Sequence, residues 1–142
     1  MKSLNYKMIT LAVKRVYLSP DVGDGIRILV DRLWPRGIAR DKAQIDLWLR
    51  DIAPSTALRK RFHGKPDAYD AFRSAYFEEL KSEAAQSAVK NLLDHLRKGP
   101  VTLLYAARDE RRNNAIALKE WLERQRKRNR ASPSPEAQAG LP

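Results

Sequence analysis

The chain has 142 residues, of which 43% are hydrophobic and 32% charged, a composition typical of a soluble globular protein with one domain. It contains no cysteine, which excludes disulfides, thiolate metal sites and cysteine nucleophiles, and its two histidines cannot by themselves form a structural zinc site. The 28 lysines and arginines outnumber the 17 aspartates and glutamates, and the resulting net charge of +11 favours anionic partners.

No apolar run approaches the roughly 20 residues that a membrane-spanning helix needs. The apolar run at residues 8–13 follows lysines, but it is too short for the core of a signal peptide and ends at Lys14 and Arg15. We therefore expect a cytoplasmic protein that does not associate with membranes.

The first predicted element is a strand over residues 8–18, which are rich in valine, isoleucine and tyrosine. A turn-rich loop over residues 19–25 separates it from the next apolar stretch. A loop of about seven residues is too short for a parallel crossover, which takes a dozen or more. The first two strands should therefore be antiparallel neighbours or not be hydrogen-bonded to each other.

Residues 26–38, IRILVDRLWPRGI, combine a buried strand with a turn that is rich in functional groups. The first half is branched and apolar, as in strands that are covered on both faces. Pro35 disfavours a helical backbone at Trp34, and Gly37 permits conformations that other residues resist. Because ligands bind beyond the carboxyl ends of strands in open α/β sheets, this turn is the leading candidate for a site.

Four amphipathic helices are predicted to follow the turn. The first would begin at Asp41 as its N-cap, and Ser55 would cap a short second helix that Gly64 stops. The third would begin near Pro66, and the fourth would end before Gly99. The apolar stripe of the first helix would consist of Ile45, Trp48, Leu49 and Ile52.

Residues 101–106, VTLLYA, are predicted to form a second uninterrupted apolar strand, followed by a polar loop and a last helix capped by Asn113 or Asn114. Several helices separate this strand from the one that begins at Ile26, which is ample for a crossover. We therefore expect the two strands to be parallel neighbours whose carboxyl ends share one edge of the sheet.

The whole pattern predicts a small three-layer α/β domain over residues 8–126, with a short, mainly parallel or mixed sheet and helices on both faces. Residues 127–142 are charged or rich in proline and serine, and residues 1–7 have no periodic apolar face. Both segments are expected to be flexible tails.

Two guanidinium groups and a carboxylate follow the second strand. Arg32 and Arg36 can hold phosphate or carboxylate groups in a bidentate fashion. Asp31 could contact a ligand, or it could pair with an arginine and brace the turn. Trp34 could stack on a planar ligand or cover the core. The turn is therefore the first expected wall of an anion-binding pocket.

The loop at residues 108–114 is the second expected wall. Arg108 is basic, and the helix N-terminus at Asn113 and Asn114 presents free backbone amides that favour negative charge. Tyr105 could donate a hydrogen bond into the pocket or pack in the core. Because the loop lacks a glycine-rich phosphate motif, a solvated basic loop is the alternative.

Three segments resemble the YeaO-like proteins, a family without an established activity: DGIRILVDRLWPRG, LWLRDIAPSTALRKRFHG and GPVTLLYAARDERRNNAIALKEWL. They occur in the same order and spacing over residues 13–122. The resemblance implies a small cytoplasmic α/β protein. In the wider related group the last strand often ends in a cysteine, but Tyr105 and Ala106 stand there in this chain, so thiol chemistry is not carried over.

The leading interpretation is a domain that binds a small phosphorylated or carboxylated molecule at the carboxyl edge of its sheet, with no cofactor and no metal. The alternative is a nucleic-acid-associated protein that uses its basic surface and residues 124–130, RQRKRNR, although no aromatic residues are interleaved there. A third possibility is an interaction module without a small ligand. The sequence leaves open whether a ligand is turned over and what the oligomeric state is.

Overall fold

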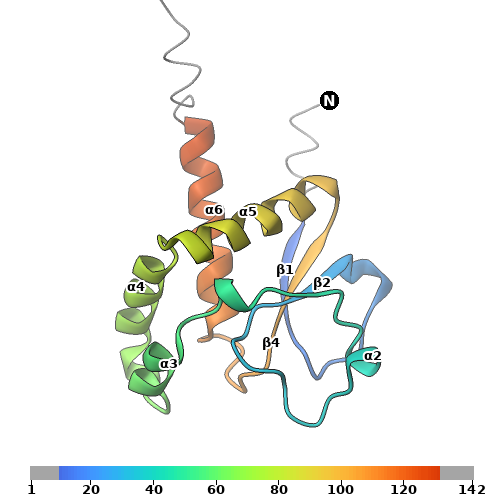
Figure 1. The fold of residues 1–142 in the computed structure, drawn as a ribbon, viewed down its shortest axis with the longest axis horizontal. Coiled ribbons are helices and arrows are strands. Elements are labelled where there is room, and N and C mark those ends of the chain that lie inside the picture. Colours follow the sequence, from blue (N-terminus) through green and yellow to red (C-terminus); the bar gives the residue numbers. More distant parts are fainter. Residues whose placement is uncertain (1–9, 132–142) are drawn as a thin grey trace, which may run out of the picture.

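The computed structural model describes the backbone of residues 10–131 and the side chains of residues 10–126. Its strands and helices are arranged as a parallel sheet with helices packed on it (Figure 1). The strands are β1 (Leu11–Arg15), β2 (Ile26–Leu29), β3 (Leu47–Trp48) and β4 (Val101–Tyr105). The α-helices are α2 (Arg40–Ala43), α3 (Thr56–Phe62), α4 (Tyr69–Glu79), α5 (Glu83–Lys98) and α6 (Asn114–Ala131), and the 3-10 helices are η1 (Val22–Asp24), η2 (Arg50–Ile52) and η3 (Pro66–Ala68).

The sheet has the strand order β1-β4-β2-β3, and all of its pairings are parallel. Val101 of β4 is in register with Leu11 of β1 on one side and with Ile26 of β2 on the other. The prediction that the two apolar strands are parallel neighbours with a common carboxyl edge is therefore confirmed. β1 and β2 are not paired with each other, because β4 lies between them.

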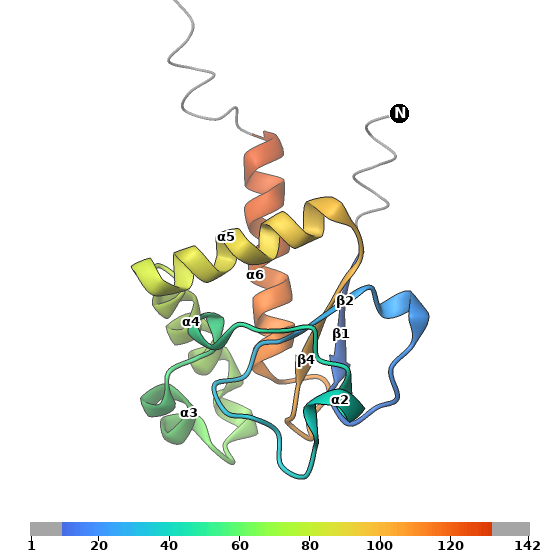
Figure 2. The same cartoon turned by 45° about the vertical axis from the view of Figure 1, so that its right-hand side comes forward.

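Because successive side chains of a strand alternate between faces, the sheet has a hydrophobic core on each face. The two cores differ in size. On one face, Val101, Leu103 and Tyr105 of β4 join the main core cluster with residues of α3, α4, α5 and α6. On the other face, Leu104 packs in a smaller second cluster that is covered by α2 and by Trp34 and neighbouring loop residues. Figures 1 and 2 show α3 and α4 at one side of the molecule and α2 at the other. The three-layer α/β prediction is thus confirmed.

The predicted helix with Asp41 as its N-cap is wrong. This region forms the single turn of α2, the strand β3 and the 3-10 helix η2. The N-cap of α2 is Ala39, and Gln44 ends the helix by adopting a left-handed backbone with a φ of 50°. Leu47 then pairs with Ile28 of β2, so the sheet gains a fourth strand that the sequence pattern did not indicate.

The apolar stripe assigned to that helix divides between the two faces of the sheet. Ile45 and Trp48 pack against the second cluster, whereas Leu49 and Ile52 belong to the main one. Spacings of three and four residues arose here in an irregular segment that crosses the edge of the sheet, and they do not reflect a helical face.

The predicted caps of the other helices at Ser55, Gly64 and Asn113 are confirmed. The Ser55 side chain accepts a hydrogen bond from the Leu58 N–H at the start of α3, and Asn113 accepts one from the Ile116 N–H at the start of α6. Gly64 follows the end of α3 with a φ of +70°, the left-handed conformation expected of a helix stop.

The expected tails fall largely outside the described residues, namely 1–7 and 132–142. Residues 127–131 continue the backbone of α6, and the C-terminal half of this helix projects beyond the rest of the described chain (Figures 1 and 2). Among the helices that the structure describes, none combines the length and the apolar character that a membrane span requires.

Candidate functional site

A cavity of about 750 Å³ lies at the carboxyl edge of the sheet. It is lined by residues that follow β2 and β4, by α3 and the start of α4, and by the beginning of α6. This volume lies within the range of about 300–1,000 Å³ that is typical of small-molecule sites.

The topology of the sheet explains why a cavity forms at this place. After β2 the chain turns away from β4 toward β3, whereas after β4 it leads into α6, which contacts β1 and β4. The two connections therefore diverge, and a crevice is left between the carboxyl ends of β2 and β4. Ligands of open α/β sheets bind at such switch points.

Asp31 lies in this cavity and holds its walls together. One carboxylate oxygen accepts a hydrogen bond from the Ala106 backbone N–H at 2.9 Å, and the other accepts one from the Asn114 side chain at 3.0 Å. Asn114 also donates to the Val30 carbonyl at 3.0 Å. Asp31 thereby connects the ends of β2 and β4 to the first turn of α6.

The expectation that an arginine would be the bracing partner of Asp31 is wrong. Arg32, the neighbouring arginine, points elsewhere and donates to the Ala53 carbonyl at 2.9 Å and to the Pro54 carbonyl at 3.4 Å. The brace is instead made of an amide side chain and a backbone N–H. Both donors are uncharged, and the Asp31 carboxylate forms no direct ion pair with any of the described residues.

Burial raises the pKa of Asp31 above its ordinary value of 3.8, and the hydrogen bonds from Asn114 and Ala106 and the charge of Arg59 offset only part of this effect. Because the folded pKa is raised, the contribution of this group to stability is fully present below pH 3.8 and is lost as the pH rises through the folded pKa.

We therefore expect the stability of the wild type, relative to Asp31→Asn, to fall as the pH rises from about 3.5 to 7. Urea unfolding of both proteins at several pH values measures this difference directly. A wild type that gains stability relative to Asp31→Asn over the same interval would contradict the assignment.

Cations line one side of the cavity. Arg59 and Lys60 come from α3, and Lys65 follows that helix; all three are exposed. No hydrogen bond or ion pair of their side chains is found within the described part of the chain. By contrast, Arg112 also lines the cavity but is paired with Asp109 at 2.9 Å.

One wall of the cavity is aromatic. Tyr69 and Phe72 are stacked with ring centroids 5.8 Å apart, and Phe62 meets Phe72 edge-on at 6.0 Å. The Tyr69 hydroxyl donates to the Asn113 carbonyl at 2.8 Å, which ties α4 to the start of α6. The rings are therefore held in place by the fold before any ligand binds.

The structure brings together only some of the residues proposed from the sequence. Asp31, Asn113 and Asn114 line the cavity. Arg36 and Arg108 are exposed and follow β2 and β4 at the same edge of the sheet, but neither lines it.

The remaining three predicted site residues are engaged in the fold. Tyr105 is 2% exposed and belongs to the main core cluster. Trp34 packs edge-to-face on Trp48, with centroids 5.4 Å apart, and its indole N–H donates to the Ile38 carbonyl. Arg32 lines a different depression.

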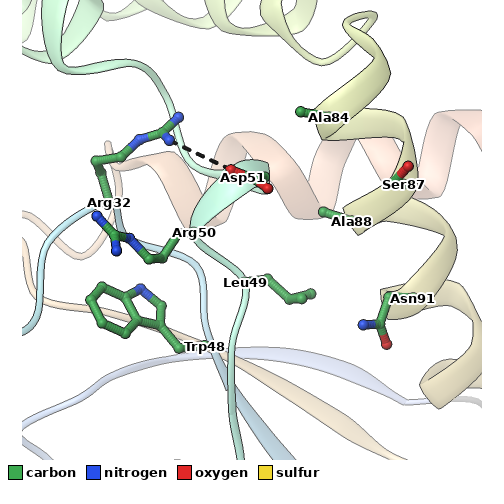
Figure 3. A pocket seen from close by; sticks show the side chains of 9 residues that line it. All are labelled: Arg32, Trp48, Leu49, Arg50, Asp51, Ala84, Ser87, Ala88 and Asn91. Atoms are coloured by element: carbon green, nitrogen blue, oxygen red, sulfur yellow. Dashed lines mark ion pairs between the residues drawn. The ribbon is translucent and has the colours of Figure 1, made fainter.

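That second depression is a shallow groove of about 580 Å³ between η2 and α5 (Figure 3). On the η2 side of this groove, Arg32 and Asp51 form an ion pair with a nitrogen–oxygen distance of 3.9 Å. Arg50 lies over the Trp48 ring at 4.9 Å from its centroid. Both arginines thus already have a partner in the groove.

The sequence did contain a signal for the cations that line the cavity. Thr56, Arg59, Lys60 and His63 occur at spacings of three and four residues within and just after α3, and all four line the cavity. The sequence pattern thus places these four residues on one helical face, although it does not show what that face lies against.

The chain belongs to a defined family. The chain is a member of DUF488-N3i, described as the inactive DUF488-N3 subclade, whose family model matches residues 10–139. The chain is 45% identical over 114 residues to the uncharacterised protein YeaO of Escherichia coli K12, which covers 80% of this chain and 97% of that protein. The predicted resemblance to the YeaO-like proteins is therefore confirmed.

Two mycobacterial proteins are also similar to the chain. Mb3100c of Mycobacterium bovis and Rv3073c of Mycobacterium tuberculosis, both called uncharacterised, are each 41% identical over 110 residues, or 78% of this chain and 91% of theirs. No solved structure gave a significant match.

Proposed function

We propose that this protein binds a small phosphorylated or carboxylated molecule in the cavity at the carboxyl edge of the sheet. The observation that carries the proposal is a set of three cations, Arg59, Lys60 and Lys65, that line one cavity at the switch point of the sheet and have no ion-pair partner among the described residues. A charged hydrogen bond to such an anion contributes about 1.5–3 kcal/mol, so two or three of them support a useful affinity.

Binding without turnover fits the chain better than catalysis. The family is described as an inactive subclade, and this chain has no cysteine. The hydroxyl of Ser55 is engaged with the Glu79 carboxylate and with the Leu58 N–H at the cap of α3, and it does not line the cavity. These observations support a binding protein as the function.

Neutralising the cations on α3 is expected to weaken binding. We expect Arg59→Gln and Lys60→Gln each to reduce the affinity for phenyl phosphate or benzoate by about 1–3 kcal/mol, or roughly 5- to 150-fold, because each removes a charged donor. Isothermal titration calorimetry of the purified proteins measures the change.

Two control variants separate the cavity from general surface charge. Lys90→Gln removes the same charge from the exposed face of α5, and Arg36→Gln removes a guanidinium that the sequence suggested as an anion ligand; neither residue lines the cavity. Both should bind as the wild type does. If Arg36→Gln abolished binding while Arg59→Gln did not, the anion site would lie on the turn after β2.

A variant of the basic segment distinguishes the cavity from the nucleic-acid alternative. Replacing the five basic residues of segment 124–130 by glutamine should leave the binding of a small anion unchanged. If this variant lost binding while Arg59→Gln kept it, the polyanion interpretation would replace the cavity.

A further inference from the structure

We propose that the ligand of this cavity is an aromatic anion that carries a hydroxyl or N–H donor away from its charged group, and that Asp31 accepts the hydrogen bond from that donor. This inference rests on the proposed function, because it assigns the chemical class of the ligand in the same cavity. It follows from three kinds of surface that meet there.

The first two kinds of surface act on different parts of one molecule. The exposed cations Arg59 and Lys60 attract an anionic group at the opening. The rings of Phe62, Tyr69 and Phe72 offer an apolar wall suited to a flat ring. Inorganic phosphate would use only the cations, so the aromatic wall indicates an organic group attached to the anion.

The third surface is the carboxylate of Asp31, which does not favour contact with an anionic group. Its charge repels a second negative group in contact with it, whereas a hydroxyl or N–H donor turns the same carboxylate into a favourable acceptor. Each of its oxygens already accepts one hydrogen bond, from Ala106 or from Asn114, and each keeps capacity for another.

The other carboxylate that lines the cavity is more heavily engaged than Asp31. Asp109 accepts hydrogen bonds from the Arg111 and Arg112 backbone N–H groups and from the Arg112 guanidinium. Asp31 accepts two hydrogen bonds against three for Asp109, and it has no ion-pair partner among the described residues, so it is the more available carboxylate for a ligand donor.

Matched probes test this assignment. Calorimetry would compare 3-hydroxyphenyl and 4-hydroxyphenyl phosphate with the corresponding methoxy compounds, which keep the ring and the charge but cannot donate. We expect the wild type to bind at least one hydroxy isomer about tenfold or more tightly than its methoxy partner. In Asp31→Asn, which loses the charge and half of the acceptor capacity, this preference should fall below about threefold, while phenyl phosphate still binds.

Asp67→Asn is the control, because it removes an exposed carboxylate of η3 that does not line the cavity, and it should keep the preference. If Asp31→Asn does not fold, the wild type alone still provides the test. The hydroxy-to-methoxy affinity ratio should fall toward one as the pH falls and Asp31 is protonated. A change in the charge of the phosphate or of another group that lines the cavity affects both probes of a pair and cancels in the ratio.

The possible outcomes distinguish failure of anion binding in the cavity from failure of the acceptor role of Asp31. No binding of phenyl phosphate, benzoate or the hydroxyphenyl phosphates by the wild type would overturn the proposed function and this inference together. Binding of phenyl phosphate that depends on Arg59, with equal affinities for hydroxy and methoxy probes, would overturn the role of Asp31 alone. A preference that survives in Asp31→Asn would also overturn it.

Discussion

Gly25→Ala is expected to lower the free energy of unfolding by about 3–5 kcal/mol. Gly25 has a φ of +67° and a ψ of −140°, a conformation that residues with a Cβ rarely adopt. A Cβ built on this residue would lie 2.2 Å from the Pro100 carbonyl oxygen. That oxygen accepts the Ile26 N–H at 3.0 Å, so it cannot move without disturbing the start of β2.

Substitutions at two other glycines separate the backbone strain from the steric contact with Pro100. Gly37 also has a positive φ, of +71°, but a Cβ there meets nothing within 4 Å, so Gly37→Ala should cost only the backbone strain, about 1–2 kcal/mol. Gly23 has neither problem, and Gly23→Ala should change stability little. Denaturant unfolding of the three variants gives the comparison. Equal losses for Gly25→Ala and Gly37→Ala would show that the contact with Pro100 is not important.

Arg27→Met is expected to be as damaging, with a loss of about 3–5 kcal/mol. Arg27 is 3% exposed, and its guanidinium forms an ion pair with Asp24 and donates to the Ala43 and Gln44 carbonyls. Methionine keeps most of the volume but leaves both carbonyls without this donor and leaves Asp24 with Lys14 as its ion-pair partner.

A double-mutant cycle tests whether the Arg27–Asp24 pair is responsible for that loss. If it is, Arg27→Met in an Asp24→Asn background should cost less than in the wild type, because the carboxylate left without Arg27 is already absent. Chemical denaturation gives all four free energies. A loss under 1 kcal/mol for Arg27→Met alone would mean that the loop around η1 and α2 relaxes and satisfies the freed groups.

The parts of the fold that were predictable are those whose signal is local. The mainly apolar runs at 26–30 and 101–106 identified the two central strands, and Ser55 and Asn113 marked helix starts through their capping side chains. β3 was missed because two residues cannot show a strand period, and its pairing with β2 is a tertiary contact. Arg27 was missed as a buried residue because its partners lie in other segments.

The candidate site was predictable in position but not in its cationic residues. The rule that ligands bind at the carboxyl edge of a parallel sheet led to the turn after β2 and to the loop after β4, and the cavity lies between them. Arg36 and Arg108 were chosen because they are adjacent to the strand ends in sequence. Arg59 and Lys60 line the cavity because α3 packs against α4 beside the crevice. Their helical spacing places them on one face of α3, but only the tertiary packing shows what that face lies against.

The most direct test of the cavity as the anion site is an NMR titration of the uniformly 15N-labelled protein with phenyl phosphate. We expect the largest amide shift changes in residues 56–65, which carry the cations, and in residues 106–114, which form the opposite wall. The groove around η2 and residues 124–142 should change little. Shift changes confined to residues 124–142 or to the groove at η2, with none around α3, would contradict the assignment of this cavity.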